Sequence, residues 1–328
     1  MISEDVLKPL ASWRGKERYG NDLLDCLTII FKTAGCSWSR CRMCSYRNER
    51  YEKQSTDALA HLLHRQLAWI VQNYTLAEFP MVKIFTSGSF FDPAEVPPDF
   101  LDAAATAFRG KIVIAETRPE YIQADTLARF IDRIDDGSYK IPVYCAIGLE
   151  TINDVIREKC IDKGFTYSDF TRAASVAHTA GAGVKAYLLF KPLFLTEGEA
   201  VADMKTSIVE ASRYADIISM NPCTVQRRTE LERYWREHAY RPPYLWSVLS
   251  ILWDAPVYVA CDPLGGGQHR GPHNCGNCDY EIVKGIRDYT LNADRDLIGA
   301  LMETECTCKQ EWEYVLDHEK SYAMPLTR

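Results

Sequence analysis

Short apolar runs alternate with stretches of helical periodicity along most of the chain. Runs rich in Val, Ile, Leu and Phe are typical of buried strands, and apolar residues that recur every three or four positions are typical of amphipathic helices. The predicted strands are residues 27–31, 82–86, 111–116, 143–149, 184–190 and 216–220. The predicted helices are residues 56–74 (with Leu59, Leu62, Leu63, Leu67, Ile70 and Val71 on one face), 98–107, 123–134, 152–160, 167–180, 197–214 and 229–237.

Six strand-then-helix units in sequence predict a parallel sheet with helices outside it, an α/β fold. Six units rather than eight indicate a partial (β/α)6 barrel of the TIM type, in which functional residues gather on the loops after the strands. The pattern breaks near residues 240–265, at Arg241-Pro242-Pro243 and then at Gly265-Gly266-Gly267. We therefore expect a barrel over residues 1–258 and a small C-terminal extension over residues 259–328.

Composition favours a soluble cytosolic protein. Hydrophobic residues make up 47% and charged residues 25% of the 328, which is ordinary for a globular chain. The first ten residues contain Glu4 and Asp5, where a signal peptide would have a basic region. The most apolar segment, residues 245–260, includes Asp254 and Pro256 and is too short and too polar to span a bilayer.

Twelve cysteines need an explanation, and disulfides are rare in a reducing compartment. Close groups of intracellular cysteines indicate metal binding. Such groups are Cys36, Cys41 and Cys44, then Cys275 and Cys278, then Cys306 and Cys308. The scattered Cys26, Cys145, Cys160 and Cys223 are interpreted as small buried apolar residues.

The formal net charge of −7 argues against nucleic-acid binding, but a sum hides local patches. Residues 32–53 contain six Lys or Arg and two Glu, so the first cysteine group lies in a segment of local charge +4. Arg14, Lys16 and Arg18 lie just upstream. A basic surface for RNA and an ordinary solvated face both fit this pattern.

Cys36, Cys41 and Cys44 have the spacing C-x4-C-x2-C in the loop after the first predicted strand. Three thiolates can bind three irons of a [4Fe-4S] cluster and leave the fourth open, and an open metal position is typical of catalysis. Thiolates also suit zinc, so a zinc site completed by a histidine or a distant cysteine is the alternative.

This loop resembles that of the radical SAM superfamily, in which S-adenosylmethionine (SAM) binds the open iron and is cleaved to a 5′-deoxyadenosyl radical. The usual spacing is one residue shorter, and Met43 occupies a position that is usually aromatic. A thioether can still pack against adenine. The resemblance implies SAM contacts in the turn Ser87-Gly88-Ser89, at the strand-end residues Glu116 and Glu150, and at Lys163. Each also has an ordinary structural interpretation as a turn residue or a helix cap.

Over residues 20–310 the chain resembles one family, RaSEA, the radical SAM subunit of archaeosine synthase, which is related to the Elp-type proteins. The matching stretches are ETRPEYI, IGLETINDVIREKCIDKGFT, KAYLLFKPLFLTEGEA, RPPYLWSVL and DPLGGGQHRGPHNCGNCD.

The family resemblance implies a tRNA substrate and a partner, ArcS, that attaches lysine to the 7-deazaguanine base in the D-loop. The radical enzyme then breaks the carbon–nitrogen bond of that lysine, and the nitrogen stays on the base in archaeosine. An electron donor for the cluster is implied too. Candidate substrate contacts are Lys191 for a carboxylate, Asn221 for the base, and Arg227 and Arg228 for phosphate.

Cys275-x2-Cys278 and Cys306-x-Cys308 are two close pairs, which suit a structural Zn²⁺ with four thiolate ligands. His269, Arg270 and His273 lie nearby in sequence and could help to form an RNA surface. A second iron–sulfur cluster, or a site in which His273 or Cys261 replaces one cysteine, are the alternatives.

Three rival functions stay open at this point. Methylthiolation in its usual form needs three more cysteines ahead of the cluster, where this chain has Cys26 alone. Elp-type acyl transfer needs an added acetyltransferase domain, for which the residues after the predicted boundary are too few. A non-catalytic, zinc-stapled RNA-binding protein would hold zinc at both sites and cleave no SAM.

Overall fold

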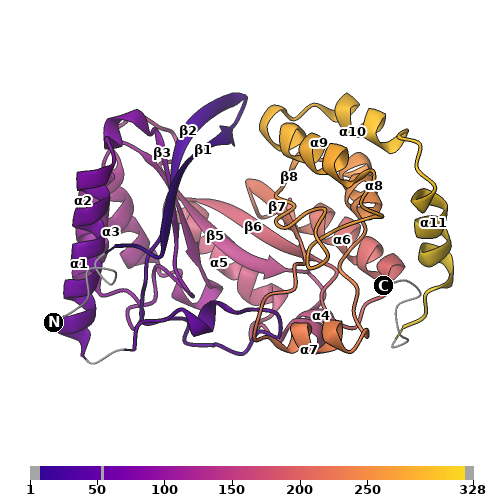
Figure 1. The fold of residues 1–328 in the computed structure, drawn as a ribbon. Coiled ribbons are helices and arrows are strands. Elements are labelled where there is room, and N and C mark those ends of the chain that lie inside the picture. Colours follow the sequence, from indigo (N-terminus) through magenta and orange to yellow (C-terminus); the bar gives the residue numbers. More distant parts are fainter. Residues whose placement is uncertain (1–7, 53–54, 322–328) are drawn as a thin grey trace. The chain divides into compact units, whose positions relative to one another are not determined.

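In the computed structural model, which describes residues 8–52 and 55–321, eight strands form one sheet whose spatial order follows the chain order (Figure 1). The strands are β1 (Ala11–Tyr19), β2 (Asp22–Ile30), β3 (Met81–Phe85), β4 (Ile112–Thr117), β5 (Val143–Glu150), β6 (Gly183–Phe190), β7 (Ile217–Pro222) and β8 (Val259–Cys261). The α-helices are α1 (Thr56–Asn73), α2 (Pro98–Ala107), α3 (Ala124–Ile134), α4 (Asp154–Ile156), α5 (Tyr167–Thr179), α6 (Glu197–Ala211), α7 (Glu230–Arg236), α8 (Leu245–Asp254), α9 (Asp279–Asn292), α10 (Arg295–Met302) and α11 (Cys308–His318). A π-helix, η5, covers Arg157–Ile161, and short 3₁₀ turns cover Tyr46–Asn48, Leu76–Glu78 and Pro119–Tyr121.

The chain divides into two compact units. The first comprises residues 1–39, 46–148 and 168–185, and the second comprises residues 40–45, 149–167 and 186–328.

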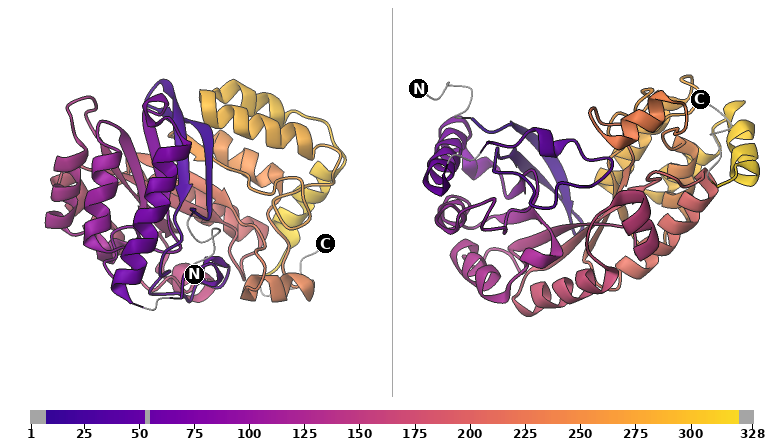
Figure 2. Two further views of the ribbon diagram at one scale, coloured as in Figure 1. Left: turned by 60° about the vertical axis from the view of Figure 1, so that its left-hand side comes forward. Right: turned by 90° about the horizontal axis from the view of Figure 1, so that it is seen from below.

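The first unit is built on a hairpin and a parallel sheet. β1 and β2 pair antiparallel through the two-residue loop Gly20-Asn21, in which Gly20 has a φ of 58° that suits the first position of a II′ turn. β2, β3, β4 and β5 then pair in parallel. Helices α1, α2 and α3 lie side by side along this sheet (Figures 1 and 2). The leucines of α1 supply a fully buried face.

The second unit contains the parallel pair β7 and β8 and most of the remaining helices. α6 begins with a capping box, in which Thr196 and Glu199 satisfy each other's backbone N–H groups. α8 is apolar on nearly all sides and is buried accordingly, with α6, α9 and α10 in contact with it (Figure 1).

The predicted alternation of strands and helices is confirmed, with most boundaries within three residues. Val71 was wrongly placed on the buried face of α1, since it is 49% exposed. The predicted helix 152–160 is one turn of α4 followed by the π-helix. The elements β1, β8, α8, α9, α10 and α11 were not predicted. The boundary after residue 258 stays a prediction; β8, which begins at the next residue, pairs with β7.

Among the described residues, no helix is both long and apolar enough to cross a bilayer.

A buried ion triad links three strands of the first unit. The Glu17 carboxylate of β1 accepts hydrogen bonds from Lys83 Nζ of β3 (2.5 Å) and Lys185 Nζ of β6 (2.9 Å). Burial raises the pKa of Glu17, but the charges of Lys185 and Lys83 lower it more, and the net value is about 2 against an ordinary 4.5. The charge on Glu17 therefore compensates two ammonium groups that have little access to water.

This triad predicts a pH-dependent contribution to stability. Because the folded-state pKa lies below the unfolded-state value, the contribution is present above about pH 4.5 and is lost as the pH falls toward 2. Glu17→Gln should lower the free energy of unfolding at pH 7 by about 3 kcal/mol, measured by urea denaturation. The gap from the wild type should close on acidification. Glu78→Gln, which breaks an exposed pair with Arg14, is the control and should cost less than about 1 kcal/mol. An equal loss for Glu17→Gln at pH 7 and pH 3 would contradict the assignment.

Candidate metal centres and cofactor site

The loop that carries Cys36 is fastened to the loop after β3. Thr33 Oγ1 donates a hydrogen bond to Glu95 Oε1 (2.5 Å), and Ser37 Oγ donates one to Asp92 Oδ2 (2.5 Å). The second oxygen of Glu95 accepts the Ser89 backbone N–H (2.5 Å). One buried carboxylate thus joins the cysteine loop to the turn that was predicted to contact SAM.

Gly88 lies directly against the cysteine loop. A Cβ atom at this position would fall well inside van der Waals contact of the Cys36 Cα and 2.5 Å from Glu95 Oε2. Only a residue without a side chain lets the two loops approach this closely. The structure therefore brings the predicted residues Cys36, Gly88 and Ser89 together.

Three neighbours of this site were not predicted from the sequence: Glu95, Arg118 and Trp38. Glu95 is 1% exposed, and burial raises its pKa. Arg118 donates its backbone N–H to Ser89 Oγ (3.1 Å), and its guanidinium lies over the Trp38 ring at 5.5 Å. The predicted Glu116 is half-buried at the end of β4, and its carbonyl accepts the Phe90 N–H (2.8 Å). The FDPAEVPP segment around Glu95 has no spacing that would have indicated this role.

The other half of the cysteine loop, residues 40–45, belongs to the second unit. Arg42 donates its backbone N–H to Ile161 O (2.9 Å) and its Nε–H to Lys159 O (3.0 Å), which docks the loop on the π-helix. Its guanidinium also pairs with Glu230 of α7 (2.6 Å). Cys41 and Cys44 flank this anchored arginine and are half-buried. Because Cys36 belongs to the other unit, the convergence of the three thiols stays a prediction.

Met43 is packed against an apolar cluster rather than exposed. The cluster comprises Leu193, Cys223, Val225, Leu231 and Tyr240, from the segments after β6 and β7. A role for Met43 against adenine stays a prediction.

The predicted residues Glu150 and Lys163 meet at the end of β5. Lys163 Nζ lies 2.7 Å from Glu150 Oε1, and each side chain is 16% exposed. Glu150 has a φ of 68°, in the left-handed region that favours glycine. The buried Arg157 secures this strand end by donating to the Leu149 and Thr151 carbonyls and pairing with Asp154.

The candidate substrate residues differ in exposure. Lys191, with a φ of 59°, is 3% exposed, and its Nζ lies 2.7 Å from Oε2 of the fully buried Glu197. Asn221 is half-buried on β7. Arg227 and Arg228 are exposed in the loop before α7. Their predicted roles stay predictions.

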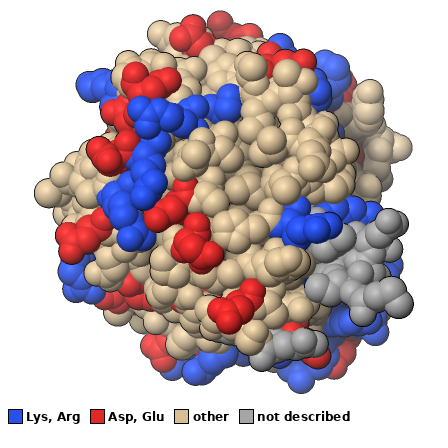
Figure 3. All heavy atoms as spheres, turned by 90° about the vertical axis from the view of Figure 1, so that its left-hand side faces the viewer, with Lys and Arg blue, Asp and Glu red and all other residues tan. Residues whose placement is uncertain are grey.

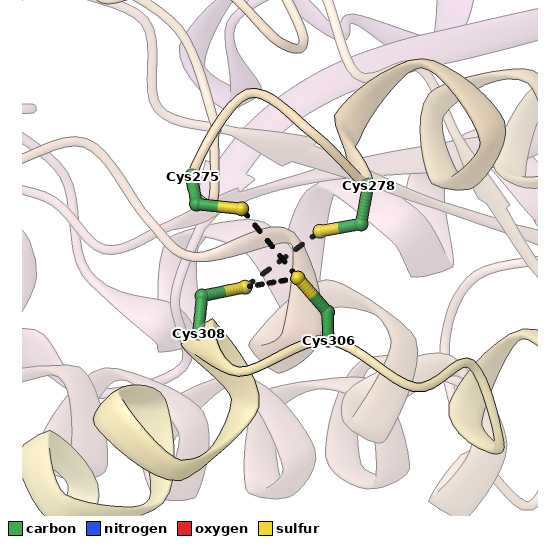
Figure 4. Close-up of side chains that lie close together, drawn as sticks. All are labelled: Cys275, Cys278, Cys306 and Cys308. Atoms are coloured by element: carbon green, nitrogen blue, oxygen red, sulfur yellow. Dashed lines mark hydrogen bonds between the residues drawn. The ribbon is translucent and has the colours of Figure 1, made fainter.

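The four C-terminal cysteines come together, as predicted. The sulfur atoms of Cys275, Cys278, Cys306 and Cys308 all lie within 4.8 Å of one another and point toward a common centre (Figure 4). One pair comes from the loop that leads into α9, and the other from the loop that leads into α11. Neither His273 nor Cys261 belongs to this group within the described part of the chain.

The sulfur separations fit a single tetrahedral ion. Cys275 and Cys306 are 3.5 Å apart, Cys278 and Cys308 3.7 Å, and Cys306 and Cys308 3.3 Å. Zn–S bonds of about 2.3 Å in a tetrahedron place the sulfurs about 3.8 Å apart. Thiolates around a four-iron cluster stand farther apart, because each binds a different iron. These three separations are close to the tetrahedral value, and the identity of the ion as zinc stays a prediction.

Outer hydrogen bonds orient two of these ligands. Asn274 Nδ2–H donates to Cys278 Sγ (3.4 Å), and Trp246 Nε1–H donates to Cys308 Sγ (3.2 Å). Such donors around metal thiolates fix ligand orientation. Burial raises the pKa of Cys278 to about 11 and also raises that of Cys308, so an incoming ion has to displace protons.

The group of four C-terminal cysteines, called the thiolate centre below, is connected to the end of β6 through hydrogen bonds to the first residues of α8. Asn274 Oδ1 accepts the N–H groups of Leu245 and Trp246, the first residues of α8. The preceding Tyr244 N–H donates to Glu197 Oε1 (2.9 Å), and Glu197 in turn holds Lys191. The thiolate centre and Lys191 are therefore parts of one buried network.

No model of a known protein family matches the chain. Methylornithine synthase shares the fold, with a TM-score of 0.51, 16% identity and coverage of 91% of this chain and 87% of that one. Archaeosine synthase subunit beta of Methanosarcina acetivorans is 38% identical over 97% of this chain and 93% of its own length. The subunit beta of Thermococcus kodakarensis is 34% identical over 93% and 96%.

The partial TIM-type barrel, with a three-cysteine loop after its first parallel strand, confirms the predicted α/β fold class. Within that class, the chain belongs to the archaeosine synthase subunit beta family. The family resemblance predicted from the sequence is confirmed.

The thiolate centre predicts a selective loss of zinc. The wild type should purify with about one zinc per chain. Cys308→Ser should remove it and lower the melting temperature by about 5 °C or more, because the ion no longer stabilises the folded state. Plasma emission spectroscopy and thermal unfolding measure both effects. Cys261→Ser, at a buried cysteine outside the group, should retain the ion. Zinc retained by Cys308→Ser would contradict the assignment.

The close approach at Gly88 predicts an effect on iron. Gly88→Ala should cost about 1–3 kcal/mol in the packing of the Cys36 loop and lower iron per chain several-fold after anaerobic reconstitution. Zinc should be unchanged. Gly15→Ala, where a Cβ would meet nothing within 4 Å, is the matched control. Normal iron in Gly88→Ala would show that the loops can separate without consequence.

Proposed function

We propose that this protein is the radical SAM subunit of an archaeosine synthase and breaks a carbon–nitrogen bond on tRNA. The substrate is the lysine adduct of the 7-deazaguanine base in the D-loop, and the bond broken joins the lysine side-chain carbon to the nitrogen that stays on the base. The observation that carries the proposal is the 38% identity to a subunit of this name over nearly the full length of both chains.

Cys36, Cys41 and Cys44 are the proposed ligands of the [4Fe-4S] cluster, and SAM is the proposed co-substrate. When bound, they supply an organic radical that can abstract hydrogen from an unactivated carbon. The protein's own residues position the cysteine loop relative to the turn that is proposed to contact SAM. The Glu95 bridge and the absence of a side chain at Gly88 hold the Cys36 loop against the Ser87–Ser89 turn.

Charged residues at the strand ends are the proposed SAM and substrate contacts. Glu150 and Lys163 offer an anion and a cation at the end of β5 for the amino and carboxylate groups of SAM. Glu116 is a further proposed SAM contact. Lys191 is proposed to face the carboxylate of the lysyl adduct, a role in which Glu197 fixes its position. Asn221 is proposed to contact the base.

The four C-terminal cysteines are proposed to bind a structural Zn²⁺, because all four coordination positions are filled by the protein. The proposed partners are tRNA, a lysine-transferring subunit of the ArcS type and an electron donor. The proposed location is the cytosol, where reduced thiols persist.

The experiment is anaerobic reconstitution followed by turnover. The wild type should bind about four irons and one zinc, and Cys36→Ala/Cys41→Ala/Cys44→Ala should lose only the iron. With a reductant, SAM and lysine-modified tRNA, the wild type should yield 5′-deoxyadenosine and archaeosine, measured by mass spectrometry of the digested nucleosides. The triple variant should yield neither.

Two other outcomes would overturn the proposal. Cleavage of SAM without loss of the lysyl group from tRNA would indicate a different radical reaction. Zinc at both sites and no cleavage of SAM would indicate the non-catalytic RNA-binding alternative.

A further inference from the structure

Two loops of the second unit form a surface that carries Arg227 and Arg228, which were predicted from the sequence to contact phosphate. One precedes and includes α7, and the other, residues 262–273, follows β8. β7 and β8 are parallel neighbours, with Ile218 opposite Val259, so both loops leave the sheet at the same edge. The surface formed by Arg227, Arg228, Arg233, Trp235, Arg236 and His269 is called the α7 surface below.

Direct hydrogen bonds preform this surface. Val225 N–H donates to Arg270 O (2.7 Å), and Arg270 Nε–H donates back to Val225 O (3.1 Å). Thr224 Oγ1 donates to Leu264 O (2.8 Å). The buried Glu232 accepts Arg270 Nη2–H (2.6 Å) and the Arg228 backbone N–H (2.7 Å). The two loops are therefore held in register without a ligand.

Aromatic and cationic groups alternate on the α7 surface. The Arg270 guanidinium lies 4.6 Å from the centre of the Trp235 ring, and the exposed His269 ring lies 5.1 Å from it. Arg233 lies 5.0 Å from the centre of the Tyr234 ring. Trp235 thus supports Arg270 and His269 from beneath, and the exposed His269 ring is of the kind on which proteins stack unpaired nucleic-acid bases.

The charge on this surface is available to a ligand. Arg227 and Arg228 are exposed, and no ion pair involves either side chain within residues 8–52 and 55–321. The side chains of Arg233 and Arg236 are 61% and 67% exposed, although each approaches a glutamate. On the face that bears α1–α3, acidic and basic side chains are interspersed and pair with one another (Figure 3). On it, for example, Asp102 lies within 3.6 Å of both Arg129 and Arg133.

We propose that the α7 surface binds RNA, with its arginines on phosphates and the exposed His269 ring stacked on an unpaired base. Guanidinium groups neutralise phosphates, and a stacked ring is tolerant of base identity, so the surface positions RNA without reading sequence. That the RNA is tRNA rests on the proposed function.

The test uses the zinc-loaded full chain and an unmodified tRNA transcript. Arg227→Ala/Arg228→Ala should weaken binding about 10-fold or more at moderate salt, and should make the slope of log K against log salt shallower by about 1.5. Fluorescence anisotropy at several salt concentrations measures both. Arg172→Ala/Lys284→Ala removes the same charge from exposed positions on α5 and α9 and should change neither.

Stacking is tested separately. His269→Ala should weaken tRNA binding about 5-fold or more and His269→Phe should restore it, because the phenyl ring can stack. Neither change should alter binding to a fully paired duplex RNA, whose bases are not accessible. Zinc content and melting temperature confirm that each variant is folded.

Unchanged tRNA binding in Arg227→Ala/Arg228→Ala, or an equal loss in the control pair, would overturn the proposal. Retained tRNA binding with loss of co-purification of the partner subunit would identify a protein-docking surface instead and would equally overturn it. Failure of the proposed reaction is distinguishable, because binding of the unmodified transcript does not require turnover. A wild type that forms no archaeosine, but whose tRNA binding depends on Arg227 and Arg228, would leave this inference intact.

Discussion

The second unit depends on one buried carboxylate. Glu197 is fully shielded from water, and its two oxygens hold Lys191 at the end of β6 and the Tyr244 N–H at the start of α8. Removal of either charge would leave the other buried without compensation, which costs several kcal/mol. Asn274 joins the same helix start to Cys278, so the group of four cysteines and Lys191 are anchored to the two sides of one turn of α8.

The cysteine loop is also held in place by hydrogen bonds and ion pairs to neighbouring segments. Its first part is fixed through Thr33 and Ser37 to the loop after β3, and its second part through Arg42 to the π-helix and α7. The extra residue in C-x4-C-x2-C falls between these two sets of anchors. A loop with fixed ends can accommodate one more residue without moving the contacts on either side. The departure from the usual spacing is thus compatible with ordinary packing around it.

Much of this architecture is readable from periodicity, and the exceptions have physical reasons. Apolar runs located β2 to β7 because parallel strands are buried on both faces. β1 was not predicted because polar residues such as Arg14 and Lys16 face solvent and interrupt its apolar pattern. The Gly20-Asn21 turn could have indicated a hairpin at this position. The paired cysteines were predictable because metal ligands cluster in sequence. Glu95 and Asn274 were not, because each acts on residues that only the fold brings near it.

The strand ends carry a conformational burden. Glu150 and Lys191 have left-handed backbone angles, and so does Arg228 before α7. For a residue with a Cβ this region is less favourable by about 1–2 kcal/mol, and glycine would occupy it without strain. The chain nevertheless retains a charged side chain at each position. Glycine would therefore be expected to raise stability at the exposed Arg228 alone, because at Glu150 and Lys191 it would also remove an ion pair with Lys163 or Glu197, which costs more than the strain it relieves.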